Sequence, residues 1–298
     1  MKKLLVLAFA VIIAGCGQQK KTDEQEFQSA LDSLKDSGPK IDEELVNGIL
    51  QQIPSPLEIS SILKESGSKY ESSILNSEDN LSRYNNNFSK ALNLGVFGTD
   101  LGYTNIYEQS KDGIKFLSAI KSLANDLSIG QFFDIETIGR LASNSKNLDS
   151  LLLITTQNFN SINNYLQTQN RSQISVLLLT GGWIEAMQIV CQVAANNPKN
   201  KDLPEKIGEQ KIILEQLVLL LSFYEKDTNM ASLLKDLREL EVAYKNIEIV
   251  TTYQKSTVKI VNGVAVITDN SSTSIKITPE DVKNITKVVS SMRNKIIK

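Results

Sequence analysis

Histidine is absent from the 298 residues of the sequence. This absence excludes Ser-His-Asp and Cys-His nucleophile systems and zinc sites with histidine ligands. It also removes the usual general base near neutral pH. Any catalysis would have to rely on carboxylates, a lysine or a hard metal held by carboxylates. We therefore expect a protein that is not an enzyme, with no cofactor and no metal site.

A strong charge of either sign is also lacking, because 32 basic and 34 acidic residues give a formal net charge of −2. No basic stripe with interleaved aromatic residues is present, so nucleic acid is not an expected partner. The alternating βαβ pattern typical of solute-binding proteins is absent as well. A hydrophobic fraction of 41% and a charged fraction of 22% are ordinary for a globular protein.

Cysteine is scarce, and the first of the two cysteines follows an N-terminal leader. Lys2 and Lys3 precede an apolar run over residues 4–13, and the small residues Ala14 and Gly15 follow it. This is the pattern of a secretory signal peptide, and the apolar run is too short to span a bilayer core of about 30 Å. We predict a signal peptide over residues 1–15.

The residues Ile13-Ala14-Gly15-Cys16 closely resemble the lipobox of bacterial lipoproteins. The resemblance implies cleavage before Cys16, a diacylglycerol thioether on its sulfur and an acyl chain on its new amino group. Each buried methylene contributes about 0.8 kcal/mol, so several chains together anchor a protein to a membrane without spanning it. The alternative is an ordinary secretory peptide with an incidental cysteine. An alkylated Cys16 would leave Cys191, in an apolar segment, as an unpaired core residue.

Apolar spacing of the helical period dominates the chain between a polar tether, residues 16–24, and residue 255. The segment SQISVLLLTGGWIEAMQIVCQVAA is nearly apolar all round, which predicts a central helix. Glu185, Gln188 and Gln192 share one face of it, which favours core packing over a membrane span. Residues 25–255 are therefore predicted to form an α-helical bundle.

The last residues, 256–298, change pattern. They begin with TVKIVNGVAVIT, two β-branched runs around Asn262-Gly263, which is a strong hairpin signal. Thr278 then caps a helix whose apolar stripe consists of Val282, Ile285, Val289, Met292 and Ile296. The predicted fold class is mainly α: a multi-helix bundle with a small C-terminal β-hairpin plus a helix appendage.

Glycines in ALNLGVFGTDLGY do not form a nucleotide loop, because no strand precedes them and no Gly-Lys-Ser/Thr follows. Ala91, Gly95, Gly98 and Gly102 are instead four, three and four residues apart, which places them along one helix face. Each glycine costs about 1 kcal/mol relative to alanine within a helix, so three of them need a packing or functional reason.

Gly181 and Gly182 make the later apolar helix a natural partner for a close crossing with that face. The alternative is a groove for a small or apolar ligand between the two helices. Its polar and aromatic lining would be Asp100, Tyr103, Trp183 and Glu185. We favour helix packing over the ligand groove.

One enzymatic alternative rests on SILKESGSKYESS, which resembles the Glu-Ser segment of lytic transglycosylases, helical enzymes that are often lipoproteins. The resemblance implies a carboxylate-dependent peptidoglycan glycosidase with Glu65 as general acid, provided that burial raises its pKa. The Gly-Leu-Met-Gln segment of that family is missing. A solvated glutamate on an amphipathic helix is the favoured interpretation.

Two further stretches resemble helical lipoproteins of Bacteroidota that have no assigned activity: SRYNNNFSKALNLGVFGTDLGYTNIY and IKITPEDVKNITKVVSSMRNKI. This resemblance implies a helical fold and a cell-envelope location, and it transfers no functional residue. Asp23, Glu24 and Glu26 resemble the surface-export signals of some of these lipoproteins. We expect a protein anchored through acylated Cys16, at the outer membrane and facing the periplasm or the surface, which binds or scaffolds an envelope protein partner.

Overall fold

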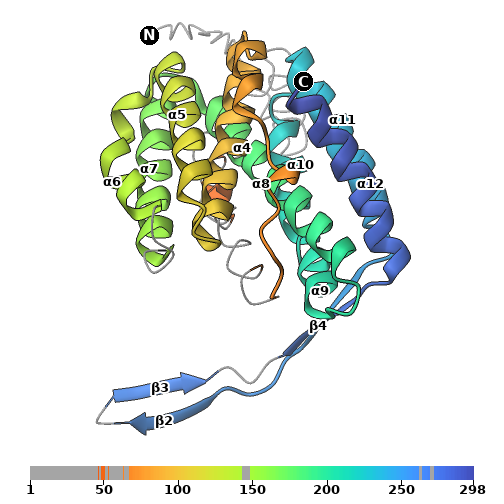
Figure 1. The fold of residues 1–298 in the computed structure, drawn as a ribbon. Helices are drawn as coiled ribbons and strands as arrows, with labels where there is room; N and C mark the ends of the chain where they lie inside the picture. The colour runs from red at the N-terminus through yellow and green to blue at the C-terminus, as the bar shows by residue number, and fades with distance from the viewer. Residues whose placement is uncertain are drawn as a thin grey trace, which may run out of the picture. The chain divides into compact units, whose positions relative to one another are not determined.

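The computed structural model describes residues 46, 48–50, 53, 63, 67–142, 148–261, 264–268 and 272–298. These residues all belong to the larger of two compact units, residues 42–298. The described part is mostly helical with two small antiparallel sheets, which confirms the predicted mainly α class (Figure 1). The predicted signal peptide, Cys16, the tether and Glu65 lie outside the described residues.

The elements follow one another as a helical series, a short β segment and a last helix. The helices are α4 (Asn87–Ile106), α5 (Ser110–Asp126), α6 (Ile135–Ala142), α7 (Leu148–Thr168), α8 (Ser172–Asn196), α9 (Asp202–Glu209), α10 (Lys211–Ser222), α11 (Thr228–Ala243) and α12 (Pro279–Ile296). The short 3-10 helices are η1 (Ser72–Ile74), η2 (Glu78–Arg83) and η3 (Gly130–Phe132). The strands are β1 (Glu248–Thr252), β2 (Thr257–Val261), β3 (Val264–Thr268) and β4 (Ser272–Lys276).

Helix α8 forms the centre of the bundle, where α4, α7, α10 and α12 pack against it. It is long and apolar enough to cross a membrane by length and composition, yet 94% of its apolar window is buried inside the protein. A helix that is apolar on all sides must be surrounded, and here the neighbouring helices surround it. The predicted central position of this segment is confirmed.

Capping residues define where several helices begin. Asn86 accepts a hydrogen bond from the Ser89 N–H at 2.8 Å, so α4 starts after it, separate from η2. Thr278 and Asp281 form a capping box at the start of α12, with Pro279 in its first turn. Such caps satisfy backbone donors that have no partner within the helix. Asn86 therefore separates α4 from η2.

The β segment consists of two separate ribbons. Strand β1 pairs with β4, and β2 pairs with β3 in a register that joins Val261 to Val264. The predicted turn Asn262-Gly263 lies outside the described residues. Strand β1 begins at Glu248, so β structure starts before the boundary predicted at residue 256. Its sequence, EIVTT, is rich in the β-branched residues that favour strands over helices.

The predicted C-terminal helix is present as α12, and it is packed into the core. Ile285 and Val289 are completely buried and Met292 nearly so, because this face contacts α8 and α11. Arg293, on the same side of the helix, is 6% exposed. The last residues of the chain therefore complete the bundle that the earlier helices begin.

Candidate functional site

Helices α4 and α8 approach so closely that two glycines cannot carry a side chain. A Cβ on Gly95 would overlap the Leu178 carbonyl oxygen and lie 2.6 Å from the Gly182 nitrogen. A Cβ on Gly181 would likewise overlap the Leu92 carbonyl group. The contacting atoms are backbone atoms, which cannot move aside as a side chain can. The structure thus places Gly95 and Gly181 in the crossing of the two helices.

The other residues of the predicted glycine face differ in their surroundings. A Cβ on Gly98 would meet nothing within 4 Å, while Gly102 and Gly182 are buried. The proposed groove lining is buried too: Asp100, Tyr103 and Glu185 are 0% exposed and Trp183 is 2% exposed. Trp183 Nε1 donates a hydrogen bond to Gln210 Oε1 at 3.0 Å. These side chains lie inside the bundle and away from its surface.

Two of those residues, Asp100 and Glu185, meet in a buried charge cluster with Arg293 of α12. Arg293 donates from Nε to Glu185 Oε2 at 2.8 Å and from Nη2 to Glu185 Oε1 at 2.9 Å. Nη2 also donates to the Ile74 carbonyl oxygen at 3.2 Å. A paired, two-point contact between arginine and a carboxylate is among the strongest hydrogen-bonding arrangements in proteins. It links α8 and α12 to the short helix η1.

Asp100 is the second acid of the cluster. Its Oδ2 accepts a hydrogen bond from the Asn76 N–H at 3.2 Å, while its buried Oδ1 has no hydrogen-bond partner among the described residues. Burial, and next the nearby charge of Glu185, raise the pKa of Asp100 well above its usual range, although Arg293 opposes this rise. Burial and the neighbouring acid thus favour the protonated form of Asp100, while the guanidinium of Arg293 is paired with Glu185.

Two neighbouring carboxyl groups are the arrangement that glycosidases use for acid catalysis. Here, however, both carboxyl groups are completely buried, Glu185 is paired with Arg293, and Asp100 Oδ2 accepts from the Asn76 N–H. A general acid must reach the atom that it protonates. The cluster is therefore a structural element that fastens α4, α8 and α12 together.

Arg293 is not among the site residues predicted from the sequence. One signal was available: Ile285, Val289 and Arg293 are spaced by four residues, so the arginine continues the buried face of α12. An arginine at such a position requires a buried acceptor, since an unpaired charge in a protein core is very costly. The spacing indicates burial, but it does not identify the acceptor.

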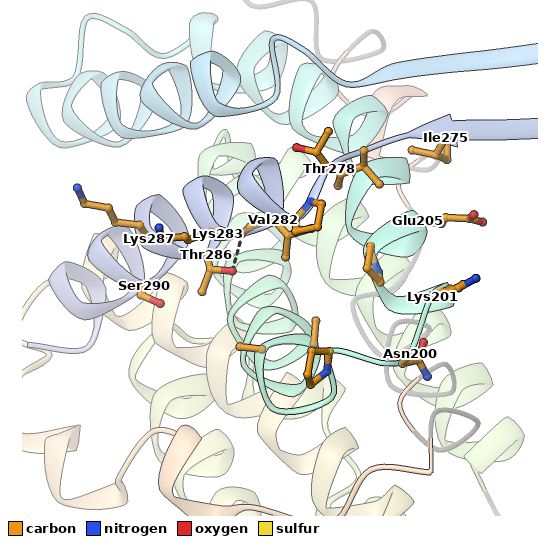
Figure 2. A pocket seen from close by; sticks show the side chains of 16 residues that line it. Asn200, Lys201, Glu205, Ile275, Thr278, Val282, Lys283, Thr286, Lys287 and Ser290 are labelled. Atoms are coloured by element: carbon orange, nitrogen blue, oxygen red, sulfur yellow. Dashed lines mark hydrogen bonds between the residues drawn. The ribbon is translucent and has the colours of Figure 1, made fainter.

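An open groove lies where the C-terminal end of α8, helix α9, strand β4 and helix α12 meet (Figure 2). Its volume is about 640 Å³. Much of its lining is apolar: Ala194, Ala195, Pro198, Pro204, Ile275, Ile277, Pro279 and Val282. The charged lining residues are Lys201, Glu205, Lys283 and Lys287. The lining therefore combines an apolar floor with an excess of positive charge.

Several polar groups of the groove are already satisfied by the protein. Asn200 Oδ1 accepts hydrogen bonds from the backbone N–H groups of Asp202 and Leu203. Thr286 Oγ1 donates to the Val282 carbonyl oxygen at 2.7 Å, as the dashed line in Figure 2 shows. Ser290 Oγ donates to a glutamine of α8 at 2.8 Å. These groups have little capacity left for a ligand.

The lysines of the groove differ from those polar groups. Within the described part of the chain, Lys201 and Lys287 have no ion-pair partner, and Lys283 lies 3.6 Å from Glu280 in a highly exposed pair. An exposed pair of this kind contributes little and exchanges readily. Figure 2 shows Lys201 on one side of the apolar floor and Lys283 and Lys287 on the other. Positive charge is thus available on both sides of the groove.

Two kinds of reactive site can be assessed in the described residues. No group of three or more acidic, cysteine or histidine residues there is placed to hold a metal ion. Burial raises the pKa of the Cys191 thiol to about 12, so it is not a nucleophile at neutral pH.

Comparison with other proteins yields no match: no protein-family model, no curated protein and no solved structure is similar to the chain.

Proposed function

We propose that this protein is a non-enzymatic, lipid-anchored helical module of the bacterial cell envelope that binds a partner protein in the groove beside α12. The lipobox-like residues around Cys16 support the anchor. The groove supports binding, because it combines an apolar floor with lysines that have no ion-pair partner in the described part of the protein. This combination is the observation that carries the proposal.

The chemistry of the groove defines its occupant. An apolar floor gains from burying apolar side chains, at about 25 cal/mol per Å² removed from water. Lysines on both sides attract carboxylates, which steer encounter and fix the register of a bound segment. Lys201 directly precedes α9 and Lys287 lies on α12, so one occupant must present acidic groups on both sides of an apolar middle. An acidic, amphipathic segment of an envelope protein meets these requirements.

Charge reversal in the groove should therefore disrupt binding. We expect Lys283→Glu combined with Lys287→Glu to weaken capture of the partner at least tenfold, because attraction becomes repulsion. The measurement is photo-crosslinking from a reactive amino acid placed at Val282, in membranes, followed by purification through the native anchor and mass spectrometry. The matched variant is Lys111→Glu with Lys121→Glu, two exposed positions on α5 away from the groove. It should crosslink like the wild type.

A second crosslinker position controls for chance proximity. Ile114 of α5 is 68% exposed and does not line the groove, so it should give none of the protein adducts found from Val282. Identical adducts from both positions would contradict the proposal. An adduct at Val282 that consists only of lipid or another small molecule would also contradict it, and would favour the alternative of a small or apolar ligand.

The anchor is tested separately at its cysteine. We expect Cys16→Ala to release the protein from the membrane fraction and to remove the mass of the acyl groups, because the sulfur that carries the diacylglycerol is gone. Cys191→Ala is the matched variant, since this buried thiol is the other cysteine of the sequence. It should remain membrane-bound. A Cys16→Ala protein that stays in the membrane at the same mature mass would show that Cys16 is not the anchor.

A further inference from the structure

Among the described elements, no helix or third strand packs extensively against the ribbon formed by β2 and β3. The two strands pair with each other, and neither makes an extensive contact with any other described helix or strand. Figure 1 shows this ribbon extending beyond the helices, and Val258 on β2 is 63% exposed. An isolated two-stranded hairpin is marginally stable in water, whereas three or more strands form a stable sheet. Within the described part of the chain, the ribbon is thus a two-stranded sheet with no strand paired to either outer edge.

The two edges differ in charge. Strand β2 has the sequence TVKIV and carries Lys259 at its centre, while β3 has the sequence VAVIT and carries no charge. Lysine on an edge strand is a common protection against pairing with another chain. By this criterion the β2 edge is protected and the β3 edge is open to pairing.

The register shows which backbone groups lie along the open edge of β3. Only two residues separate the paired Val261 and Val264, so this pair closes the hairpin and is hydrogen-bonded. Hydrogen-bonded pairs alternate along antiparallel strands, which makes Lys259 and Val266 the next such pair. The N–H and C=O groups of Ala265 and Ile267 therefore point away from β2.

We propose that a second copy of this chain occupies that edge, with the two β3 strands antiparallel about a twofold axis at Val266. Ala265 then lies opposite Ile267 of the second copy, and the outward N–H and C=O groups of both pairs satisfy one another. The pairing is symmetric and closed, and it turns two hairpins into one four-stranded sheet. The same pairing through β2 would place Lys259 opposite Lys259, and like charges directly opposite are destabilising.

The proposed dimer predicts that a cysteine at position 266 forms a disulfide with the same position of the second copy. Val266 faces Val266 of the second copy in a pair without hydrogen bonds, where the Cα atoms lie about 4.5 Å apart. This separation permits a disulfide. We expect Val266→Cys in the full-length chain, kept in detergent and treated with copper phenanthroline, to form a covalent dimer within minutes. Mass spectrometry should find two copies of tryptic peptide 260–276 joined. Thr257→Cys, an exposed position on β2, is the matched variant and should not crosslink.

A second pair of variants tests the dimer without cysteine chemistry. Native mass spectrometry from detergent should show the wild type as a dimer, and Val266→Lys should weaken it at least tenfold because two lysines would face each other. Thr257→Lys should leave the dimer intact. A wild type that is monomeric at all concentrations would overturn the proposal, as would equal crosslinking at positions 257 and 266. Because no residue of β2 or β3 lines the groove, these results are independent of partner binding there.

Discussion

Alanine at position 95 should destabilise the protein severely, whereas alanine at position 98 of the same helix should stabilise it slightly. The added methyl of Gly95→Ala would overlap the Leu178 carbonyl oxygen, so α4 and α8 must separate to admit it. Overpacking of a core costs about 1–3 kcal/mol or more, and we expect at least about 3 kcal/mol because the obstacle is backbone. At Gly98 the methyl has free space, and replacing a helical glycine gains about 0.5–1 kcal/mol.

The measurement is urea unfolding followed by circular dichroism. Gly181→Ala provides an internal check, because its methyl would overlap the Leu92 carbonyl group from the opposite helix. Once one substitution has separated the helices, the second costs less, so the double variant should lose less stability than the sum of the two single losses. Equal free energies of unfolding for the variants at 95 and 98 would mean that α4 and α8 do not meet at Gly95.

The spacing of these glycines shows how far a sequence pattern can predict a contact. Residues three apart lie about 60° from each other around a helix axis, because each residue advances about 100°. Gly95 and Gly98 therefore belong to one broad face but not to one line. The sequence predicts a broad glycine face, while the position of α8 determines that Gly95, and not Gly98, is in the tight contact.

In the C-terminal region, too, the local sequence predicts the helix but not its contacts with distant residues. Thr278, Pro279 and the apolar stripe predict helix α12 from local rules, and its start and its buried residues follow that pattern. The acceptor of Arg293 could not be predicted, because Glu185 lies 108 residues earlier in the chain. The groove is equally non-local, since it needs the end of α8, helix α9 and strand β4 beside α12. The local sequence therefore predicts the helices and strands, whereas the residues that meet in a site depend on how distant helices and strands pack.

Arg293→Met should be the second strongly destabilising substitution. Removing one partner of a buried ion pair costs about 3–5 kcal/mol, because the remaining charge is left without a counterion in the core. Here Arg293 is the cation that faces both Glu185 and Asp100. The control lies two residues further along α12: Lys295 pairs with Asp236 at 2.7 Å, but the lysine is 58% exposed. Lys295→Met should therefore change the free energy of unfolding by no more than about 1 kcal/mol.

The effect of Arg293→Met should also depend on pH in a defined direction. The pKa of Asp100 is raised in the folded protein, so its contribution to stability is complete below its unfolded pKa of about 3.9 and is lost as pH rises through the folded value. Arg293 opposes that rise, and its removal raises the pKa of Asp100 further. The stability deficit of the variant should thus grow as pH rises through the folded pKa of wild-type Asp100, as measured by urea unfolding of both proteins over a pH series.

Replacing both Glu185 and Arg293 tests whether the bundle requires this charged pair or is equally stable with apolar side chains in its place. Glu185→Leu combined with Arg293→Met leaves Asp100 without either charged neighbour, and its proton then keeps it neutral. Apolar replacement of a whole buried ion pair is often neutral or stabilising, so the double variant should recover most of the stability lost in Arg293→Met. It should also lose most of the added pH dependence. A double variant as unstable as the single one would show that the bundle depends on the hydrogen bonds from Arg293 to Glu185 and Ile74, and that charge balance alone is not sufficient.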